Sequence, residues 1–400
     1  MIRDKTIPCL ILSAFFPYLY GGARVEHLVF PSFFLVLVLI SILNISAISL
    51  PLLGMSLLLL FGTLFTLISS LVTPDTGAMA PALTMGTRLL LPAIVLATVA
   101  CHPPVKYDMV RLAAQTIVWI SVPLSMLAAG TIFFDMSWLI NLYVQTGDDT
   151  VWSNAIAVGR YTGLFGQPLE AGIFYSVALL ALVYLASLNW GSSMSRRLFL
   201  TFILIGGSLS LSKNFVILGA LVALIYAVSV RVLSIRLGCA VLGLMVASMS
   251  GWLFLSSGNY SSSFIDLFDE GGLLLALTAG RLGKGDTEVA QLWAHLQHSG
   301  NWITGFGLGS HLPLDSGYLE YFYQGGLLAF GCYVLFIVGI FVLAISYWPD
   351  NVSKLLFSIF LFIVGSSLGG PVVTASRANV PLLMLIATCV LHLGLKKSKL

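Results

Sequence analysis

The sequence predicts an all-α fold, a polytopic transmembrane helical bundle of about twelve spans with one large extracytoplasmic loop that contains short helices. Two observations lead to this prediction. The 400 residues are 58% hydrophobic and only 9% charged, with a mean hydropathy of +1.00, whereas a soluble domain carries about 25% charged residues. Apolar runs of about 18 or more residues also recur, and each can cross a bilayer as a helix. These runs are apolar on all sides, unlike barrel strands, which alternate apolar and polar residues.

The candidate spans follow one another along the whole chain, so residues 1–400 form a single integral membrane domain. Two intervening loops are long: the larger covers 256–316 and the second covers 134–165. The first, second, seventh and eighth spans are short enough to be re-entrant or tilted. The spans are expected near 7–22, 28–43, 50–72, 80–101, 110–133, 166–188, 198–211, 214–230, 237–255, 317–346, 353–370 and 378–394.

The distribution of lysine and arginine predicts that both termini are cytoplasmic, because short cytoplasmic loops carry an excess of these residues. In this orientation every strong basic cluster lies inside, and both long loops lie outside. Seven of the 19 lysines and arginines are left on the outer side: Arg24, Arg88, Arg160, Lys213, Arg281, Lys284 and Arg377.

Four of these outer cations, Arg88, Arg160, Lys213 and Arg377, lie in or next to apolar runs. A charge at membrane depth is costly, so it usually faces the bundle interior or a polar cavity and has a partner. Several cations at one membrane face predict an anion site, and phosphate or pyrophosphate suits them because a guanidinium binds its oxygens in a bidentate fashion.

The one long polar interval, 259–323, is where most of the chemistry is expected. Within it, 286–298 predicts an amphipathic helix, and this interpretation is favoured over a metal site for His295 and His298, which lack a third ligand at a suitable spacing. The glycines of GFGLG at 305–309 predict a tight turn, since no Lys-Ser/Thr pair follows as in a nucleotide loop. The five cysteines lie singly, which favours small buried hydrophobic residues.

Four segments together resemble the superfamily of bacterial O-antigen polymerases and O-antigen ligases. The family pattern places an arginine at a span entry, a cation at the outer end of a small-residue span, and a second arginine and a Gly-rich turn in a large loop. The segments are RYTGLFGQPLEAG (160–172), LSLSKNFVILGALVAL (209–224), AGRLG (279–283) and GFGLGSHLPLDSGYLEYFYQGGL (305–327).

The resemblance implies specific roles. Arg160 matches the first arginine, which is expected to hold a diphosphate, and Arg281 matches the second. Asp315 stands where ligases carry a histidine followed by asparagine, which favours a polymerase, although a shifted alignment would supply His311 instead. Lys213 stands where arginine is common, and it binds phosphate as a point charge.

The implied reaction is metal-independent glycosyl transfer at the periplasmic face of the bacterial inner membrane, without a cofactor. The substrate is an undecaprenyl-diphosphate-linked oligosaccharide within the membrane lipid. A chain-length regulator and a flippase are expected as partners, and nucleic acid is not. Cations would stabilise the leaving diphosphate, and a base would take the acceptor proton. The candidate residues are Arg160, Arg281, Lys213, Arg88 and Arg377 for the diphosphate, Asp315, Arg281, His311 and Glu320 for catalysis, and Tyr318 and Glu170 for sugar binding.

Simpler interpretations stay open at several positions. Asp315 is also a good N-cap for a helix that begins at 316, and Arg160 suits the membrane interface. Tyr318, Tyr321 and Tyr323 fit an interfacial aromatic belt better than sugar stacking.

Two alternative functions also remain: an O-antigen ligase that transfers glycan to lipid A core, and a polysaccharide or lipid transporter or flippase. The absence of an internal repeat and of paired broken helices argues against the transporter.

Overall fold

The computed structural model describes residues 5–17, 25–42, 48–72, 79–101, 108–136, 138, 142–143, 149–157, 159–236, 266, 269, 288–308 and 316–397. Within these ranges all regular structure is helical. The helices are α1 (Thr6–Ser13), α2 (Val25–Ile42), α3 (Leu50–Val72), α4 (Met79–Ala100), α5 (Met109–Phe133), α7 (Asp149–Ala157), α8 (Pro168–Ser187), α9 (Ser193–Leu209), the π-helical turn η4 (Asn214–Gly219), α10 (Ala220–Ser229), α13 (Glu288–Ser299), α14 (Gly317–Ser346), α15 (Asn351–Ser366) and α16 (Ser376–Lys397).

Every predicted span coincides at least in part with a helix, except 237–255, which lies outside the described residues. Five of the described helices, α3, α5, α8, α14 and α16, are long and apolar enough to cross a membrane. By length and composition the chain is therefore a helical membrane protein, while the number of twelve spans stays a prediction. The prediction for 7–22 was too long, because α1 ends at Ser13 and a turn follows that ends at Pro17. A proline disfavours helix in the residue before it.

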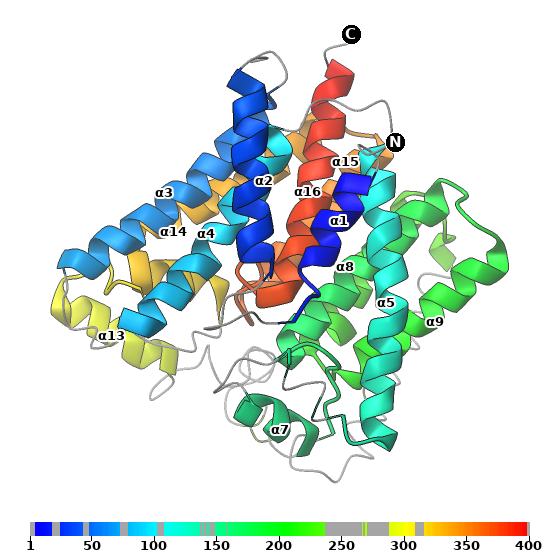
Figure 1. Cartoon of the computed structure of the whole chain (residues 1–400), viewed down its shortest axis with the longest axis horizontal. Helices are drawn as coiled ribbons and strands as arrows, with labels where there is room; N and C mark the ends of the chain where they lie inside the picture. Colours follow the sequence, from blue (N-terminus) through cyan, green and yellow to red (C-terminus); the bar gives the residue numbers. More distant parts are fainter. Residues whose placement is uncertain are drawn as a thin grey trace.

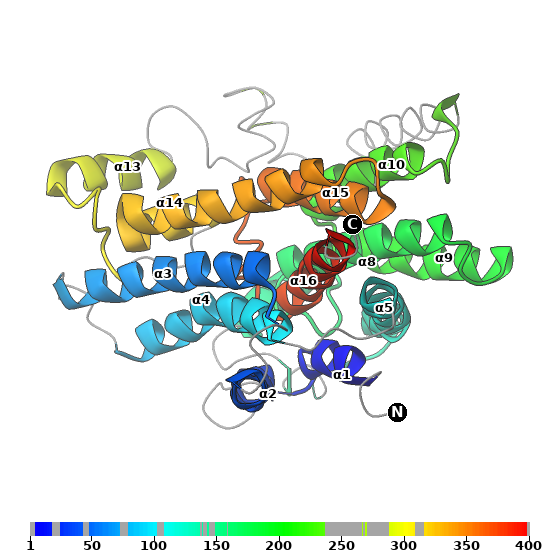
Figure 2. The same ribbon diagram turned by 90° about the horizontal axis from the view of Figure 1, so that it is seen from above.

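Helices α8 and α16 form the centre of the bundle. In each, 83% of the most apolar window is buried, compared with 33% in α14. Figure 2 shows α16 between α14 and α15 on one side and α1 and α2 on the other. Figure 1 shows that α16 ends at the same end of the molecule at which α1 begins, whereas α7 lies at the opposite end. The 22 residues of α16 span about 33 Å, close to the thickness of a bilayer core of about 30 Å.

Helix α14 is kinked in its N-terminal third, and a glycine-rich turn packs into the kink. Gly326 has φ +65° inside the helix. The turn that includes Gly305 and Gly307 packs against it, since Phe306 N–H donates to the Tyr323 carbonyl (2.9 Å) and Gly307 N–H donates to the Gln324 carbonyl (2.8 Å). The turn is also bound to the end of α3, because Leu308 N–H donates to Ser70 Oγ (2.6 Å). These contacts fit the predicted tight turn.

The expected amphipathic helix in the large loop is present as α13, within two residues of the predicted bounds. Its Leu296 is buried against Tyr323. His295 stacks on Phe306, with ring centroids 4.5 Å apart, and its Nδ1 lies 3.0 Å from the Tyr323 hydroxyl. Helix α13 therefore packs on the N-terminal third of α14. The aromatic-belt interpretation was wrong for Tyr321 and Tyr323, which are 1% and 4% exposed.

Candidate functional site

Three non-helical connections converge inside the bundle, and we call them together the polar node: residues 160–167 before α8, 210–213 between α9 and η4, and 367–375 between α15 and α16. Their interior polar side chains are almost fully buried, with Thr162 at 1%, Ser210 at 0% and Thr374 at 1% exposure. Non-helical backbone at membrane depth is tolerated only where it is buried in protein or lines a water-filled cavity. The polar node is therefore a candidate functional site.

Arg160 joins the first connection to the second. Its Nε donates to the Ser210 carbonyl and its Nη2 to the Leu211 carbonyl, each at 3.4 Å. The backbone follows the same path, since Tyr161 N–H donates to the Leu209 carbonyl (2.8 Å). These carbonyls follow the C-terminus of α9, where the helix dipole favours a cation. Arg160 is only partly buried.

Lys213 lies directly before the π-helical turn η4, on the connection that Arg160 contacts. Helix α8 and η4 approach each other very closely there. A β-carbon at Gly172 would lie 2.2 Å from Ser212 Oγ, and one at Gly219 would lie 2.1 Å from Ser176 Oγ. Small residues let helices in membranes approach this closely, and π-helical turns are frequent at functional sites. The packing thus fixes the backbone that carries Lys213.

Arg377, in the first turn of α16, joins the first connection to this helix, which follows the third connection. Its Nη1 donates to the Leu164 carbonyl at 2.6 Å, and its guanidinium lies 5.1 Å above the Tyr143 ring, a cation–π contact. The third connection also packs against α8 and η4. A β-carbon at Gly370 would lie 2.5 Å from the Leu169 side chain of α8, and one at Gly369 would lie 3.8 Å from Asn214 Oδ1 of η4. Arg377 is only 2% exposed, so this buried side chain binds the 160–167 connection to the start of α16.

Glu320 forms a second polar group beside the third connection. The Thr374 hydroxyl donates to Glu320 Oε2, and Arg88 of α4 is the opposite charge that acts on this carboxylate. Glu320 is 1% exposed, and Gln324, one turn further along α14, is fully buried. No hydrogen-bond partner is found for either polar atom of the Gln324 amide, among the residues that the structure describes. A buried carboxylate and a buried amide within one turn of an apolar helix are costly, which makes this turn a candidate functional site.

The start of α14 is anchored on the same connection. Ser316 is its N-cap, with its Oγ accepting from Leu319 N–H (3.5 Å) and donating to the Ser367 carbonyl (2.9 Å). Gly317 N–H donates to the Ser367 and Gly370 carbonyls, at 2.9 and 3.1 Å. The alternative of Asp315 as the cap was therefore wrong, because the neighbouring serine performs that role. Glu320 is held in place by a rigid helix start.

The structure places the predicted residues Arg160 and Lys213 on two connections of the node that are bonded to each other. Arg377 is bonded to the first of these connections, and Glu320 interacts with Thr374 and Arg88. Glu170 lies in the first turn of α8, 6% exposed, where a helix N-terminus favours a carboxylate. The Tyr318 hydroxyl donates to the Val364 carbonyl at 3.1 Å, which binds α14 to α15. The predicted residues Arg281, His311 and Asp315 lie outside the described residues.

Sequence reasoning missed Thr374, Gln324 and Asn214. Each is a polar residue in an apolar stretch, which is the signal that would have singled them out.

A comparison with protein-family models and with curated protein sequences finds no match for this chain. Across the described ranges, no three His, Cys, Asp or Glu side chains gather so that they could hold a metal ion. Metal independence stays a prediction from the sequence.

Proposed function

We propose that the chain is a glycan polymerase of a bacterial inner membrane, which uses an undecaprenyl-diphosphate-linked repeat unit as donor and a second one as acceptor. A hydroxyl oxygen of the acceptor attacks the anomeric carbon of the donor, and the bond between that carbon and the diphosphate oxygen breaks. Undecaprenyl diphosphate leaves with the electron pair, and the hydroxyl proton passes to a base. No metal or cofactor takes part.

One observation carries this proposal: cations from separate parts of the sequence converge on one polar node in an apolar bundle. Arg160 and Lys213 are partly exposed there and lie on connections that are bonded to each other. A diphosphate that gains charge as it leaves needs cations that are already positioned. We assign these two residues to the diphosphate, and we assign the enclosed Arg377 to holding the 160–167 connection.

The position of the node supports the same proposal. Helix α16 runs from the node to the end of the molecule where α1 begins (Figure 1), and its length of about 33 Å is that of one bilayer core. With cytoplasmic termini, as the distribution of lysine and arginine predicts, the node would lie at the periplasmic interface, where a polyprenyl-linked diphosphate is found.

The base is assigned by chemistry and sequence. Asp315 is our first candidate, with His311 and Glu320 as alternatives. Glu320 is nearly fully buried and bonded to Thr374, so an acceptor hydroxyl reaches it only if the outer end of α14 moves. Asp315 immediately precedes the Ser316 cap and lies in the sequence at the end of the large loop, just before α14.

The test replaces Arg160 by alanine and by lysine in cells that make the polymer. Arg160→Ala should leave single repeat units unpolymerised and lower the rate by roughly 10²–10³-fold, as expected for the loss of one positioned charge. Arg160→Lys should retain part of the activity, because lysine keeps the positive charge but cannot bind a phosphate in the bidentate fashion of a guanidinium. Arg197→Ala is the matched control, since Arg197 is exposed near the opposite end of α9. Polymer of normal length from Arg160→Ala would remove Arg160 from the diphosphate site.

A further inference from the structure

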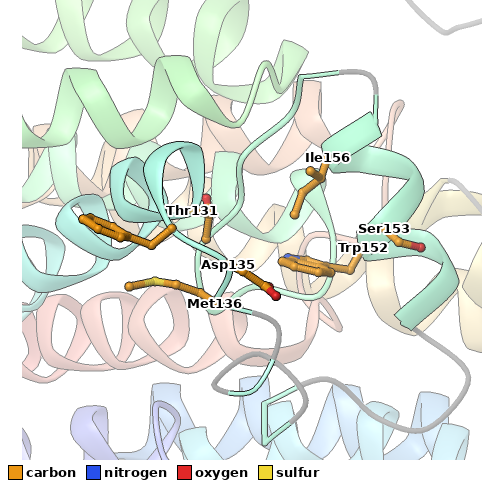
Figure 3. Close-up of a pocket in the computed structure, with 7 residues that line it drawn as sticks. Thr131, Asp135, Met136, Trp152, Ser153 and Ile156 are labelled. Atoms are coloured by element: carbon orange, nitrogen blue, oxygen red, sulfur yellow. The ribbon is translucent and has the colours of Figure 1, made fainter.

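A pocket of about 240 Å³ lies between the end of α5 and helix α7, outside the polar node. Figure 3 shows the side chains around it. Trp152 and Ile156 are four residues apart on α7, and therefore on one face of that helix. The side chains that line it include Thr131, Asp135, Met136, Trp152, Ser153 and Ile156.

The lining combines a flat aromatic ring with polar groups. Trp152 Nε1 is buried, and within the described part of the chain no acceptor for its hydrogen is found. Asp135 supplies a carboxylate beside it (Figure 3). The Thr131 hydroxyl donates to the Ala128 carbonyl at 2.7 Å, which leaves its oxygen to accept. A pocket of this kind orients its ligand through a few polar groups against an apolar wall.

A pyranose ring fits this lining better than a hydrocarbon chain. The C–H face of a sugar packs on an aromatic ring, and its hydroxyls exchange hydrogen bonds with a carboxylate and with hydroxyl groups. A polyprenyl chain would place hydrocarbon against the Asp135 carboxylate, a charged group that is costly to cover with apolar atoms.

The pocket is connected directly to the polar node through the backbone. Gly159 N–H donates to the Ile156 carbonyl and Arg160 N–H to the Ala155 carbonyl, both at 2.8 Å, so α7 leads into Arg160 without a free loop. Along the axis of α7, Trp152 lies about 6 Å from Ile156, on the side away from Arg160. A glycan that extends from a diphosphate at Arg160 has the pocket within reach.

We propose that this pocket is a pyranose-binding subsite for the glycan of the lipid-linked substrate. The inference rests on the proposed function for the identity of that glycan. Donor and acceptor carry the same sugars, so the sugar in the pocket could belong to either substrate. Separate KM measurements for donor and acceptor distinguish the two.

The first test measures binding without catalysis. Full-length protein in nanodiscs is mixed with the free oligosaccharide repeat unit of the host's surface polysaccharide, and saturation-transfer NMR records which sugar protons contact protein. The wild type should transfer saturation to the C–H face of one ring, and Trp152→Ala should abolish it. Trp152→Phe should restore most of it, since the aromatic face is kept. Equal transfer in the wild type and Trp152→Ala would overturn the proposal.

The second test measures KM for each substrate separately. The lipid-linked repeat unit serves as donor, and an alkyl glycoside of the repeat unit, which has no diphosphate, serves only as acceptor. Trp152→Ala should raise one of the two KM values about tenfold with little change in kcat, and the affected substrate identifies the source of the sugar. Unchanged values for both would overturn the proposal.

The control variant is Trp138→Ala, because Trp138 is 67% exposed and does not line the pocket. It should behave as the wild type in both tests. Binding that depends on Trp152 in a protein that makes no polymer would retain the sugar site and refute the polymerase. Polymer formation that depends on Arg160 but not on Trp152 would retain the polymerase and refute the sugar site.

Discussion

Replacement of Gly326 by alanine should severely destabilise the N-terminal third of α14. Gly326 has φ +65° and ψ −163°, a conformation that is essentially restricted to glycine. A β-carbon there would lie 2.1 Å from the Ile303 carbonyl oxygen. Because that atom is backbone, the contact is relieved only if the glycine-rich turn moves away from the helix.

The magnitude follows from these two effects. The strained backbone costs about 1–3 kcal/mol. Displacement of the turn also weakens hydrogen bonds such as Leu327 N–H to the Trp302 carbonyl (3.0 Å), each worth about 1 kcal/mol. We expect Gly326→Ala to lower the free energy of unfolding by about 3–5 kcal/mol.

The assay is reversible unfolding by SDS in mixed micelles, with circular dichroism as the readout. Gly331→Ala is the matched control on the same helix, because a β-carbon at Gly331 meets no atom within 4 Å. It should stabilise the protein by about 0.5–1 kcal/mol, since alanine favours helix over glycine. A Gly326→Ala protein as stable as Gly331→Ala would refute the kinked packing of α14.

Two further predictions concern buried and capping polar groups. The Tyr333 and Ser367 hydroxyls are 2.8 Å apart and buried, so Tyr333→Phe and Ser367→Ala should each cost about 1–3 kcal/mol, and their double variant should cost less than the sum; additive costs would show that the bond contributes nothing. Burial acts to raise the pKa of Asp350, but hydrogen bonds from Lys396 and from Val352 N–H outweigh it and hold the pKa below its ordinary value of 3.8. The unfolded carboxylate therefore takes up a proton at higher pH than the folded one, so its contribution is complete above about pH 4 and is lost as pH falls further. Unfolding followed from pH 7 to pH 3 should show a smaller acid loss for Asp350→Asn, which keeps the N-cap, and an unchanged loss would contradict this.

The helices were predictable because each is encoded locally. Helix α14 has the predicted bounds, 317–346, since a serine cap precedes a long apolar run. Its kink was not predictable, because Gly325 and Gly326 look like small residues in a membrane helix, and only the packed turn at Gly305 shows that φ must be positive.

The candidate site was predictable in its residue types but not in its arrangement. Unusual outer cations identified Arg160, Lys213 and Arg377 from the sequence. Their convergence depends on bonds between distant segments, such as Arg377 to the Leu164 carbonyl, and no periodicity encodes such a bond. The electrostatic interaction of Arg88 with Glu320 depends in the same way on the packing of the helices.

The most direct test of the proposed function uses purified protein in nanodiscs with an undecaprenyl-diphosphate-linked repeat unit and a chelator, and resolves the products on a gel. We predict a ladder of polymer for the wild type and single repeat units for Arg160→Ala. The absence of a ladder from the wild type, while a control polymerase makes one from the same substrate, would contradict the proposal.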